Sequence, residues 1–349
     1  MLRHEFLRLG ALPLLGGVGP AKADTACILL MMVGGPSQVD TFDMKPDAPS
    51  DVRGPFRSIR TNVPGIEISE IFPRTARQAD KFSLIRSMYH TGPAVHDAGH
   101  HVMQTGRLFS YDVAHPGFGC VVSHFQGARH AMLPGPIGAT GGNMPHGDGP
   151  GLLGDRFAPV VMGCDDVSAP SRYGGNRFGR SCFQALRLVE SGVRFVTVNM
   201  FETVFDELTW DIHGAKPFTP ISAYRDVVGP MFDMAYSSLL EDLSRRGMLA
   251  NTMVIAMGEF GRTPRINAAG GRDHWTRCYT VLAGGGPLTG GIVVGSSDAI
   301  GGEPKDRPVH PGELAATIYK GMGIPLGTEL RPGLAVVEPG VTPISELFA

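Results

Sequence analysis

Short apolar runs alternate along this chain with segments whose apolar residues recur at helical spacing. The apolar runs predict buried strands, at residues 26–35, 82–88, 193–200, 253–258, 278–284 and 292–295. The helical spacing predicts helices, at residues 118–126, 178–190, 224–246 and 311–321. Because strands and helices alternate throughout, the pattern indicates an α/β sandwich with a largely parallel central sheet flanked by helices.

Loops rich in glycine and proline separate these elements. The chain contains 48 Gly and 28 Pro in 349 residues, a composition that favours many tight turns over a helical bundle. Irregular segments are expected at 44–65, at 134–155 and at 258–264. No internal repeat and no linker interrupts the pattern, so residues 24–349 are expected to form a single domain.

The first 23 residues have the layout of an export signal. Basic residues precede an apolar run, and Ala-Lys-Ala stands just before Asp24. The segment RHEFLRLGA resembles a twin-arginine signal in which His4 replaces one arginine. An amphipathic first helix is the alternative, but the glycines and prolines between Pro13 and Pro20 disfavour it. We therefore expect export to the periplasm or the cell surface.

Charge and cysteine content exclude several classes of function. The formal net charge is -2, so no nucleic-acid partner is expected. No apolar run beyond residue 35 is long enough to span a bilayer. The five cysteines are widely spaced without a CxxC pair, which argues against a thiolate zinc site and a disulfide scaffold.

Between Thr91 and Arg107 the chain carries a dense histidine segment, TGPAVHDAGHHVMQTGR. At 3.6 residues per turn, His96 and His100 would share one helix face, and Asp97 would share the neighbouring face with His101. Neutral imidazole and carboxylate are ligands for zinc and similar divalent metals. The segment therefore predicts one side of a polar site that depends on metal.

Further acidic residues and histidines follow three of the predicted strands. They are Asp40 and Asp43, Asp211 and His213, and Glu259 with Asp273 and His274. Because strand ends of an open α/β sheet converge on one edge, these groups are expected to share one site. Taken singly, Asp211 could cap a turn, and Glu259 could pair with Arg262 or Arg265. Zinc is the expected metal, with calcium and manganese as alternatives.

Several motifs resemble those of a known family. They are GGPSQVDTFDMKP, HDAGHHVMQTGR, RYGGNRFG, SGVRFVTVN, WDIHG, GEFGRTPRIN, GGRDHW and RPVHPGELAATIY. With them, residues 26–325 resemble an exported bacterial family called domain of unknown function 1501 (DUF1501), which is sulfatase-like and belongs to the alkaline phosphatase superfamily. The resemblance implies an alkaline phosphatase-like sandwich with a mixed, largely parallel central sheet and one or two metal ions at the strand ends.

The resemblance also implies roles at the histidine segment. In the superfamily the nucleophile begins a helix that typically ends nine residues later in Thr-Gly, and Thr105 and Gly106 match that ending. Counting back nine residues from Thr105 reaches His96, where the superfamily hydrolases carry Ser, Thr or a modified Cys. The usual covalent mechanism therefore does not carry over. Instead, His96 or His100 is expected to serve as a ligand or general base, and Arg262 to hold an anionic oxygen.

The remaining ligand positions follow from the same resemblance. The metal residues are expected to be Asp40 (with Asp43 as its competitor), Asp211, His213, Glu259, Asp273 and His274. His310 is either a further site residue or a surface-loop histidine. The stretch between Gly154 and Gly174 is shorter than expected for the family, which indicates a missing lid or specificity element.

Two functions remain open from the sequence. The first is an exported, metal-dependent hydrolase of sulfate or phosphate esters, with an anionic ester such as a sulfated polysaccharide as substrate. The second is a non-catalytic exported protein of the same fold that binds a metal, an anion or a glycan. The absent hydroxyl or thiol at position 96 and the presence of Phe260 favour the second, whereas the many His, Asp and Glu residues favour the first.

Overall fold

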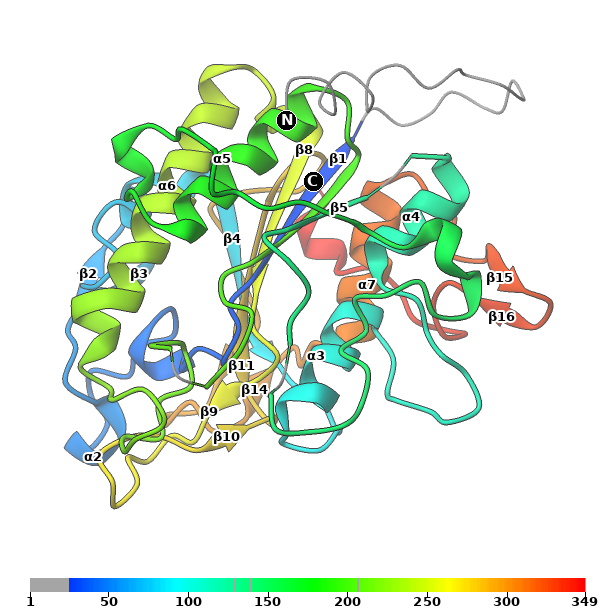
Figure 1. Cartoon of the computed structure of the whole chain (residues 1–349). Coiled ribbons are helices and arrows are strands. Elements are labelled where there is room, and N and C mark those ends of the chain that lie inside the picture. Colours follow the sequence, from blue (N-terminus) through cyan, green and yellow to red (C-terminus); the bar gives the residue numbers. More distant parts are fainter. Residues whose placement is uncertain (1–24, 129, 139, 206, 349) are drawn as a thin grey trace.

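The computed structural model describes residues 25–128, 130–138, 140–205 and 207–348. The expected export segment, 1–23, lies outside these residues. A central sheet stands between two groups of helices (Figure 1). Within the described part of the chain, no helix is long and apolar enough to cross a membrane.

The central sheet has eight strands in the order β12-β4-β11-β8-β1-β7-β5-β6. They are β1 (Ala26–Met31), β4 (Phe82–Met88), β5 (Ala131–Leu133), β6 (Val160–Val161), β7 (Phe195–Asn199), β8 (Thr252–Met257), β11 (Tyr279–Gly285) and β12 (Val293–Val294). Strand β11 runs antiparallel to β4 and β8, and the other pairings of this sheet are parallel. The expected α/β sandwich with a mixed, largely parallel sheet is confirmed.

Strand β1 explains where a site can form. It lies between β7 and β8, parallel to both, and all six of its residues are buried. A strand covered by neighbours and by both layers of helices must be apolar along its whole length, as this one is. The loops that leave β1, β7 and β8 therefore emerge together at one edge of the sheet, where ligands bind in open α/β folds.

Helices cover both faces of the sheet. On one face, α5 (Arg177–Glu190) contacts β7 and packs against α6 (Gly229–Arg245). On the other, α7 (Pro311–Gly321) contacts both α3 (His96–Thr105) and α4 (Phe118–Gln126). The four helices expected outside the histidine segment are all present. The long one differs at its start, where Tyr224–Val228 forms a π-helical turn before α6.

The loop expected at 258–264 contains a short strand. Strand β9 (Gly261–Arg262) pairs antiparallel with β10 (His274–Trp275), and Arg262 lies opposite His274. Strands of two residues leave no periodic pattern in a sequence, so only the tertiary fold shows this pairing. The pairing joins the GEFGRTP and GGRDHW motifs at one place.

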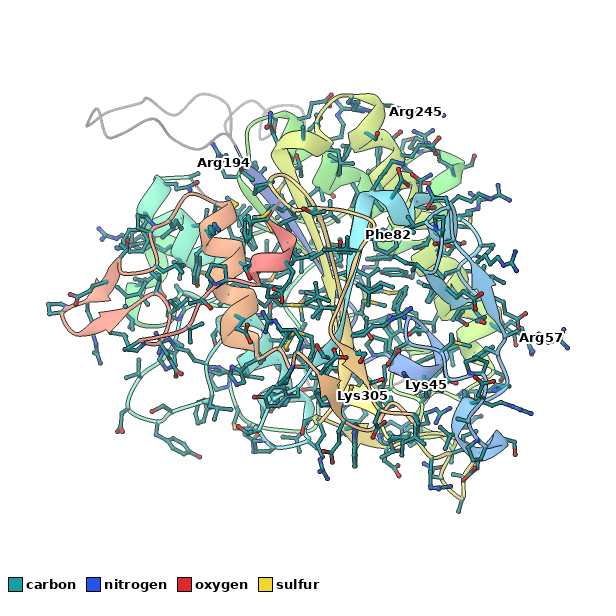
Figure 2. All side chains as sticks on the ribbon, turned by 180° about the vertical axis from the view of Figure 1, so that it is seen from behind. Lys45, Arg57, Phe82, Arg194, Arg245 and Lys305 are labelled. Carbon is teal, nitrogen blue, oxygen red and sulfur yellow. The ribbon has the colours of Figure 1, made fainter. Side chains whose placement is uncertain are left out.

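The other short elements lie around this framework. They are α2 (Ser50–Arg53), β2 (Ser58–Arg60), β3 (Glu67–Ser69), β13 (Ser296–Ser297), β14 (Pro304–Asp306), β15 (Glu329–Arg331) and β16 (Leu334–Ala335). The segment 44–65, expected to be irregular, thus holds α2 and β2. Side chains fill the space between the sheet and the helices (Figure 2), and buried apolar residues form a continuous core there. The five cysteines are buried and free, as small apolar core residues.

Candidate metal centre

Helix α3 brings its first two histidines to the carboxyl edge of the sheet. The helix begins at His96, and all ten of its residues are buried. His96 and His100 lie one turn apart on one face, as expected, and both are close to Glu259 in the loop after β8. Gly106 ends the helix with a φ of 73°, and a Cβ there would lie 2.5 Å from the Cβ of Ala315 in α7. The glycine therefore lets the helix pack closely against α7.

Glu259 forms one half of the site with these two histidines. The Nδ1 atom of His96 lies 2.6 Å from Oε1 of Glu259, and Nε2 of His100 lies 3.5 Å from the same oxygen. The backbone N–H of Gly34, in the loop after β1, also donates to this oxygen at 2.8 Å. The Glu259 side chain is fully buried. Loops after two parallel strands and one helix start thus meet at a single carboxylate.

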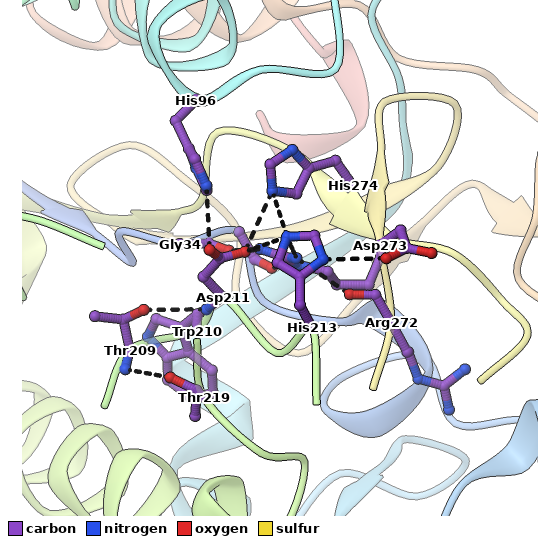
Figure 3. A network of polar contacts seen from close by, with 12 residues as sticks. Gly34, His96, Thr209, Trp210, Asp211, His213, Thr219, Arg272, Asp273 and His274 are labelled. Carbon is purple, nitrogen blue, oxygen red and sulfur yellow. Dashed lines mark hydrogen bonds and ion pairs between the residues drawn. The ribbon is translucent and has the colours of Figure 1, made fainter. Parts of the chain in front are cut away.

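Asp211, in the loop that follows β7, forms the other half (Figure 3). Its Oδ1 atom lies 3.1 Å from Nε2 of His213 and 3.2 Å from Nε2 of His274. These two nitrogens are 3.0 Å apart. Its other oxygen, Oδ2, lies 3.5 Å from Nε2 of His96. The His96 ring therefore stands between the two carboxylates, with one nitrogen toward each.

Two outer contacts orient the histidines beside Asp211. Nδ1 of His274 lies 2.9 Å from the carbonyl oxygen of Ala94, which can only accept a hydrogen bond. Nδ1 of His213 lies 3.0 Å from Oδ1 of Asp273. With Nδ1 of each ring used in this outer contact, the Nε2 atom of each ring faces Asp211. Asp273 thus reaches the site as an outer partner of His213 rather than through the metal-ligand position expected from the sequence.

Several ligand atoms in this cluster are buried without a hydrogen-bond partner among the described residues. They are Nε2 of His96, both ring nitrogens of His100, Oδ2 of Asp211 and Oε2 of Glu259. An unsatisfied buried polar group costs about 1–3 kcal/mol. Two sets of ligand atoms lie close enough to hold a cation, His96 with Asp211 and His274, and His96 with His100 and Glu259. Imidazole nitrogens and carboxylate oxygens together suit zinc.

The electrostatics of the cluster keep its ligand atoms available. Burial lowers the pKa of His100 to about 4, so its ring is neutral near pH 7. Burial would raise the pKa of Glu259, but His100 and His96 hold it at about 2. Burial opposes a charge on His96, yet Asp211 and Glu259 raise its pKa. The site therefore presents two carboxylates and a neutral imidazole next to His96, whose pKa the two carboxylates raise.

A family model matches most of this chain. Residues 24–173 and 165–334 match the model of a protein family of unknown function, DUF1501. The chain belongs to the DUF1501 family. The two matched segments overlap at residues 165–173, within the stretch expected to be shorter than in the family. Among curated proteins, none matches this DUF1501 chain.

Solved structures with a similar course of the chain share little sequence with this DUF1501 protein. One is a protein of the alkaline phosphatase superfamily from Vibrio parahaemolyticus, with a TM-score of 0.48, 11% identity, and coverage of 87% of this chain and 68% of that one. Another is the lipoteichoic acid synthase LtaP from Listeria monocytogenes, with a TM-score of 0.46, 9% identity, and coverage of 91% and 75%. The sulfatase PsFucS1 from Pseudoalteromonas sp. has a TM-score of 0.41, 14% identity, and coverage of 87% and 68%.

Asp40 lies outside both sets of ligand atoms in the DUF1501 chain. Both of its oxygens are used in a buried, forked ion pair with Arg272, at 2.6 and 3.1 Å. Ser37 also donates to Oδ2 at 2.6 Å. Its competitor Asp43 contacts Lys45 at 3.0 Å and Arg86 at 3.7 Å. The structure thus brings together five of the six expected metal residues, counting Asp273 in the outer position, and places Asp40 in a structural ion pair.

His310 has a structural role in this DUF1501 fold. It precedes α7, where its Nδ1 accepts from the N–H of Gly312 at 3.1 Å, and Oε1 of Glu313 accepts from the N–H of His310 at 3.1 Å. This reciprocal pair is a capping box. The sequence left open whether His310 is a site residue or a surface-loop histidine. In the structure it is the N-cap of α7.

Removal of this cap tests the assignment. His310→Ala is expected to lower the free energy of unfolding by about 1 kcal/mol, because one helix cap is lost. His310→Asn should retain most of the stability, since asparagine is a preferred cap. Urea unfolding and metal analysis of both variants provide the measurements. Loss of bound metal in His310→Ala would instead place His310 in the metal centre.

Two residues beside the centre of this DUF1501 chain, His146 and Phe218, were not expected from the sequence. His146, from the Gly/Pro-rich loop, lies edge-on to His100 with ring centroids 5.5 Å apart, and its Nε2 is 3.2 Å from Asp97. Phe218 lies against His213 with ring centroids 4.6 Å apart. A histidine in a loop was the only signal for His146, and the sequence carried none for Phe218.

A groove opens beside His213. It has a volume of about 690 Å³ and is lined by Glu207, Leu208, Gly214, Lys216, Pro217, Phe218 and Pro220. His213 and His274 are also the most accessible histidines of the centre, with 22% and 19% of their side chains exposed. The groove thus lies next to His213, which Phe218 of its lining contacts.

Proposed function

We propose that this chain is an exported, metal-dependent hydrolase of sulfate or phosphate esters. One observation carries the proposal: buried ligand atoms of His96, His100, Asp211 and Glu259 have no hydrogen-bond partners among the described residues, and these residues fall into two sets of ligand atoms that share His96. A purely structural cluster would leave these groups unsatisfied at a large cost. The place of the cluster, at the carboxyl ends of β1, β7 and β8, is where such folds bind their ligands.

The donor set fits a divalent metal ion. His96, His100 and Glu259 would hold it, with Asp211 on the far side of His96. The imidazoles of His96, His100 and His274 beside two carboxylates favour zinc over calcium, which prefers oxygen ligands. When bound, the ion supplies a Lewis acid for a sulfuryl or phosphoryl oxygen and lowers the pKa of water.

The protein itself supplies orientation and charge. Because His96 begins α3, the free N–H groups of the first turn are available to an anionic ester next to it. No hydroxyl or thiol stands at position 96, so we assign the attack to water rather than to a side chain. Burial lowers the pKa of His274, which leaves its Nε2 free at neutral pH to accept a proton from that water.

The groove beside His213 suits a sugar ring that carries a negative charge. Phe218 offers an aromatic face next to the centre, and Lys216, which lines the groove together with Glu207, makes no ion pair with any described residue. We therefore place the group that leaves on hydrolysis in this groove, with the ester oxygens toward Asp211 and His274. A sulfated polysaccharide has both the rings and the charges for this arrangement.

Metal analysis and turnover measurements test this function. The mature protein is expected to carry divalent metal and to hydrolyse an aryl sulfate or an aryl phosphate. Chelation should abolish turnover, and added zinc or manganese should restore it, because the ligand atoms lie ready in the fold. If the protein binds no metal and neither ester is hydrolysed after metal is added back, the proposal fails.

A non-catalytic binding protein is the second candidate. The histidine at position 96, where related hydrolases have a nucleophile, favours it. It predicts that the protein binds metal with all of the ligands above, yet hydrolyses neither class of ester under any metal. The same panel of measurements therefore separates the two candidates.

A further inference from the structure

Arg262 is a buried cation, and all of its side-chain N–H groups face acceptor atoms of the protein. Its side chain is fully buried. Its Nε donates to the carbonyl oxygen of Gly35 at 2.9 Å, and its Nη2 donates to the carbonyl oxygen of Gly34 and to Oδ1 of Asp211. Its Nη1 donates to the carbonyl oxygen of Arg272 at 3.2 Å and lies 3.5 Å from Nε2 of His213. A guanidinium has five N–H groups, and each has an acceptor here. Arg262 therefore has no donor left to hold an anionic substrate oxygen, the role expected from the sequence.

The acceptors around this guanidinium form a triangle that resembles a metal site. Oδ1 of Asp211 and the Nε2 atoms of His213 and His274 lie 3.0 to 3.2 Å from one another. The outer contacts of both histidines use their Nδ1 atoms and leave the Nε2 atoms facing inward. Because acceptor atoms this close to one another repel, a positive charge next to them is needed for stability. In this fold, Arg262 supplies it through the contact with Asp211.

We propose that the guanidinium of Arg262 takes the place of a second metal ion, so that the centre binds one divalent ion rather than two. This inference rests on the metal binding in the proposed function. The single ion belongs to the half formed by His96, His100 and Glu259. Among the described residues, Glu259 forms ion pairs only with these two histidines, so no guanidinium or ammonium group takes the place of an ion there.

Electrostatics explain why the Asp211 half excludes an ion. An ion bonded to Oδ1 of Asp211 would lie about 2 Å from it, and Nη2 of Arg262 contacts the same oxygen. An ion on the free Oδ2 would still share this one carboxylate with the guanidinium. A divalent ion and a guanidinium would then be neighbours in a buried environment, where repulsion between charges is strong. The guanidinium also cannot withdraw, because Gly34 and Gly35 hold it on the other side.

The chain contains a matched control for this argument. Arg272 is also fully buried and forms an ion pair with Asp40. That pair is surrounded by backbone carbonyls of Val52, Thr263 and Pro264 instead of histidines. Removal of Arg272 therefore leaves Asp40 without a counter-charge and without further metal ligands nearby. Removal of Arg262 leaves Asp211 without a counter-charge beside the imidazoles of His213 and His274.

Metal stoichiometry of the purified, metal-free protein tests the proposal. Zinc is titrated by calorimetry in the presence of a weak competing chelator, which prevents surface sites from filling. We expect one equivalent for the unmodified chain, two for Arg262→Met, and one each for Arg262→Lys and Arg272→Met. Circular dichroism before titration checks that each variant is folded.

Each outcome decides the proposal. Two equivalents in the unmodified chain, in Arg262→Lys or in Arg272→Met would overturn it, and so would one equivalent in folded Arg262→Met. If Arg262→Met does not fold, the counts for the unmodified chain and Arg262→Lys decide. No zinc in the unmodified chain would contradict the metal dependence in the proposed function, a result distinct from a count of two.

Discussion

Replacement of His96 by alanine is expected to cause the largest loss of function in this protein. We expect turnover of the ester substrate to fall by a factor on the order of 10²–10⁴. The affinity for zinc should fall at least about 100-fold, more than for loss of an outer partner of a ligand. The reason is that the ring stands between Glu259 and Asp211, at 2.6 and 3.5 Å, and belongs to both sets of ligand atoms.

His101 provides the control for this variant. It lies in the same helix and is also buried, but its ring contacts Phe109 and His115 instead of the carboxylates. His101→Ala should therefore keep both its zinc affinity and its turnover, even if its thermal stability falls. Equal losses in both variants would show that the histidine helix matters for folding rather than for the metal.

Asp211→Asn is expected to lower the stability of the fold strongly. Asp211 is the only described carboxylate within ion-pair distance of Arg262, and both side chains are fully buried. Removal of one partner leaves an uncompensated charge in the interior, which costs about 3–5 kcal/mol. Urea unfolding of the metal-free protein should show this loss. Zinc binding should weaken in the same variant, because one oxygen beside His96 becomes an amide.

Two other carboxylates calibrate this result. Asp51 pairs with Arg265 at the surface, where 48% and 65% of their side chains are exposed, so Asp51→Asn should change stability by less than about 1 kcal/mol. Asp40→Asn should destabilise the fold about as much as Asp211→Asn, since its partner Arg272 is fully buried. It should nevertheless keep full zinc affinity. A weakened affinity in Asp40→Asn would support the ligand role that the family resemblance implies for Asp40.

The expected strands and helices largely agree with the structure, because burial leaves a periodic record in the sequence. The apolar run of β1 indicates a strand covered on both sides, and the strand at 82–88 and the helix at 311–321 have the expected bounds. The pairing of β9 with β10 has no such record, because each strand has two residues and depends on contacts between distant segments.

Much of the candidate site was also predictable, since strand order places loop residues at one edge. His96, His100, Asp211, His213, Glu259 and His274 lie together there, as the motifs led us to expect. The contacts of His146 with His100 and of Phe218 with His213 could not be predicted, because they depend on how two irregular loops fold over the site.

The sequence by itself determined the sheet, the family and the histidine segment at its carboxyl edge, because these depend on local periodicity and motif. Only the tertiary structure decided how the charges are paired. Asp40 and Asp211 have the same charge and both follow strands, yet one is fully used by Arg272 and the other keeps an oxygen free beside His96. Arg262 likewise changed from an expected substrate clamp to a buried counter-charge, since the number of acceptors around a guanidinium is set by segments far apart in the chain.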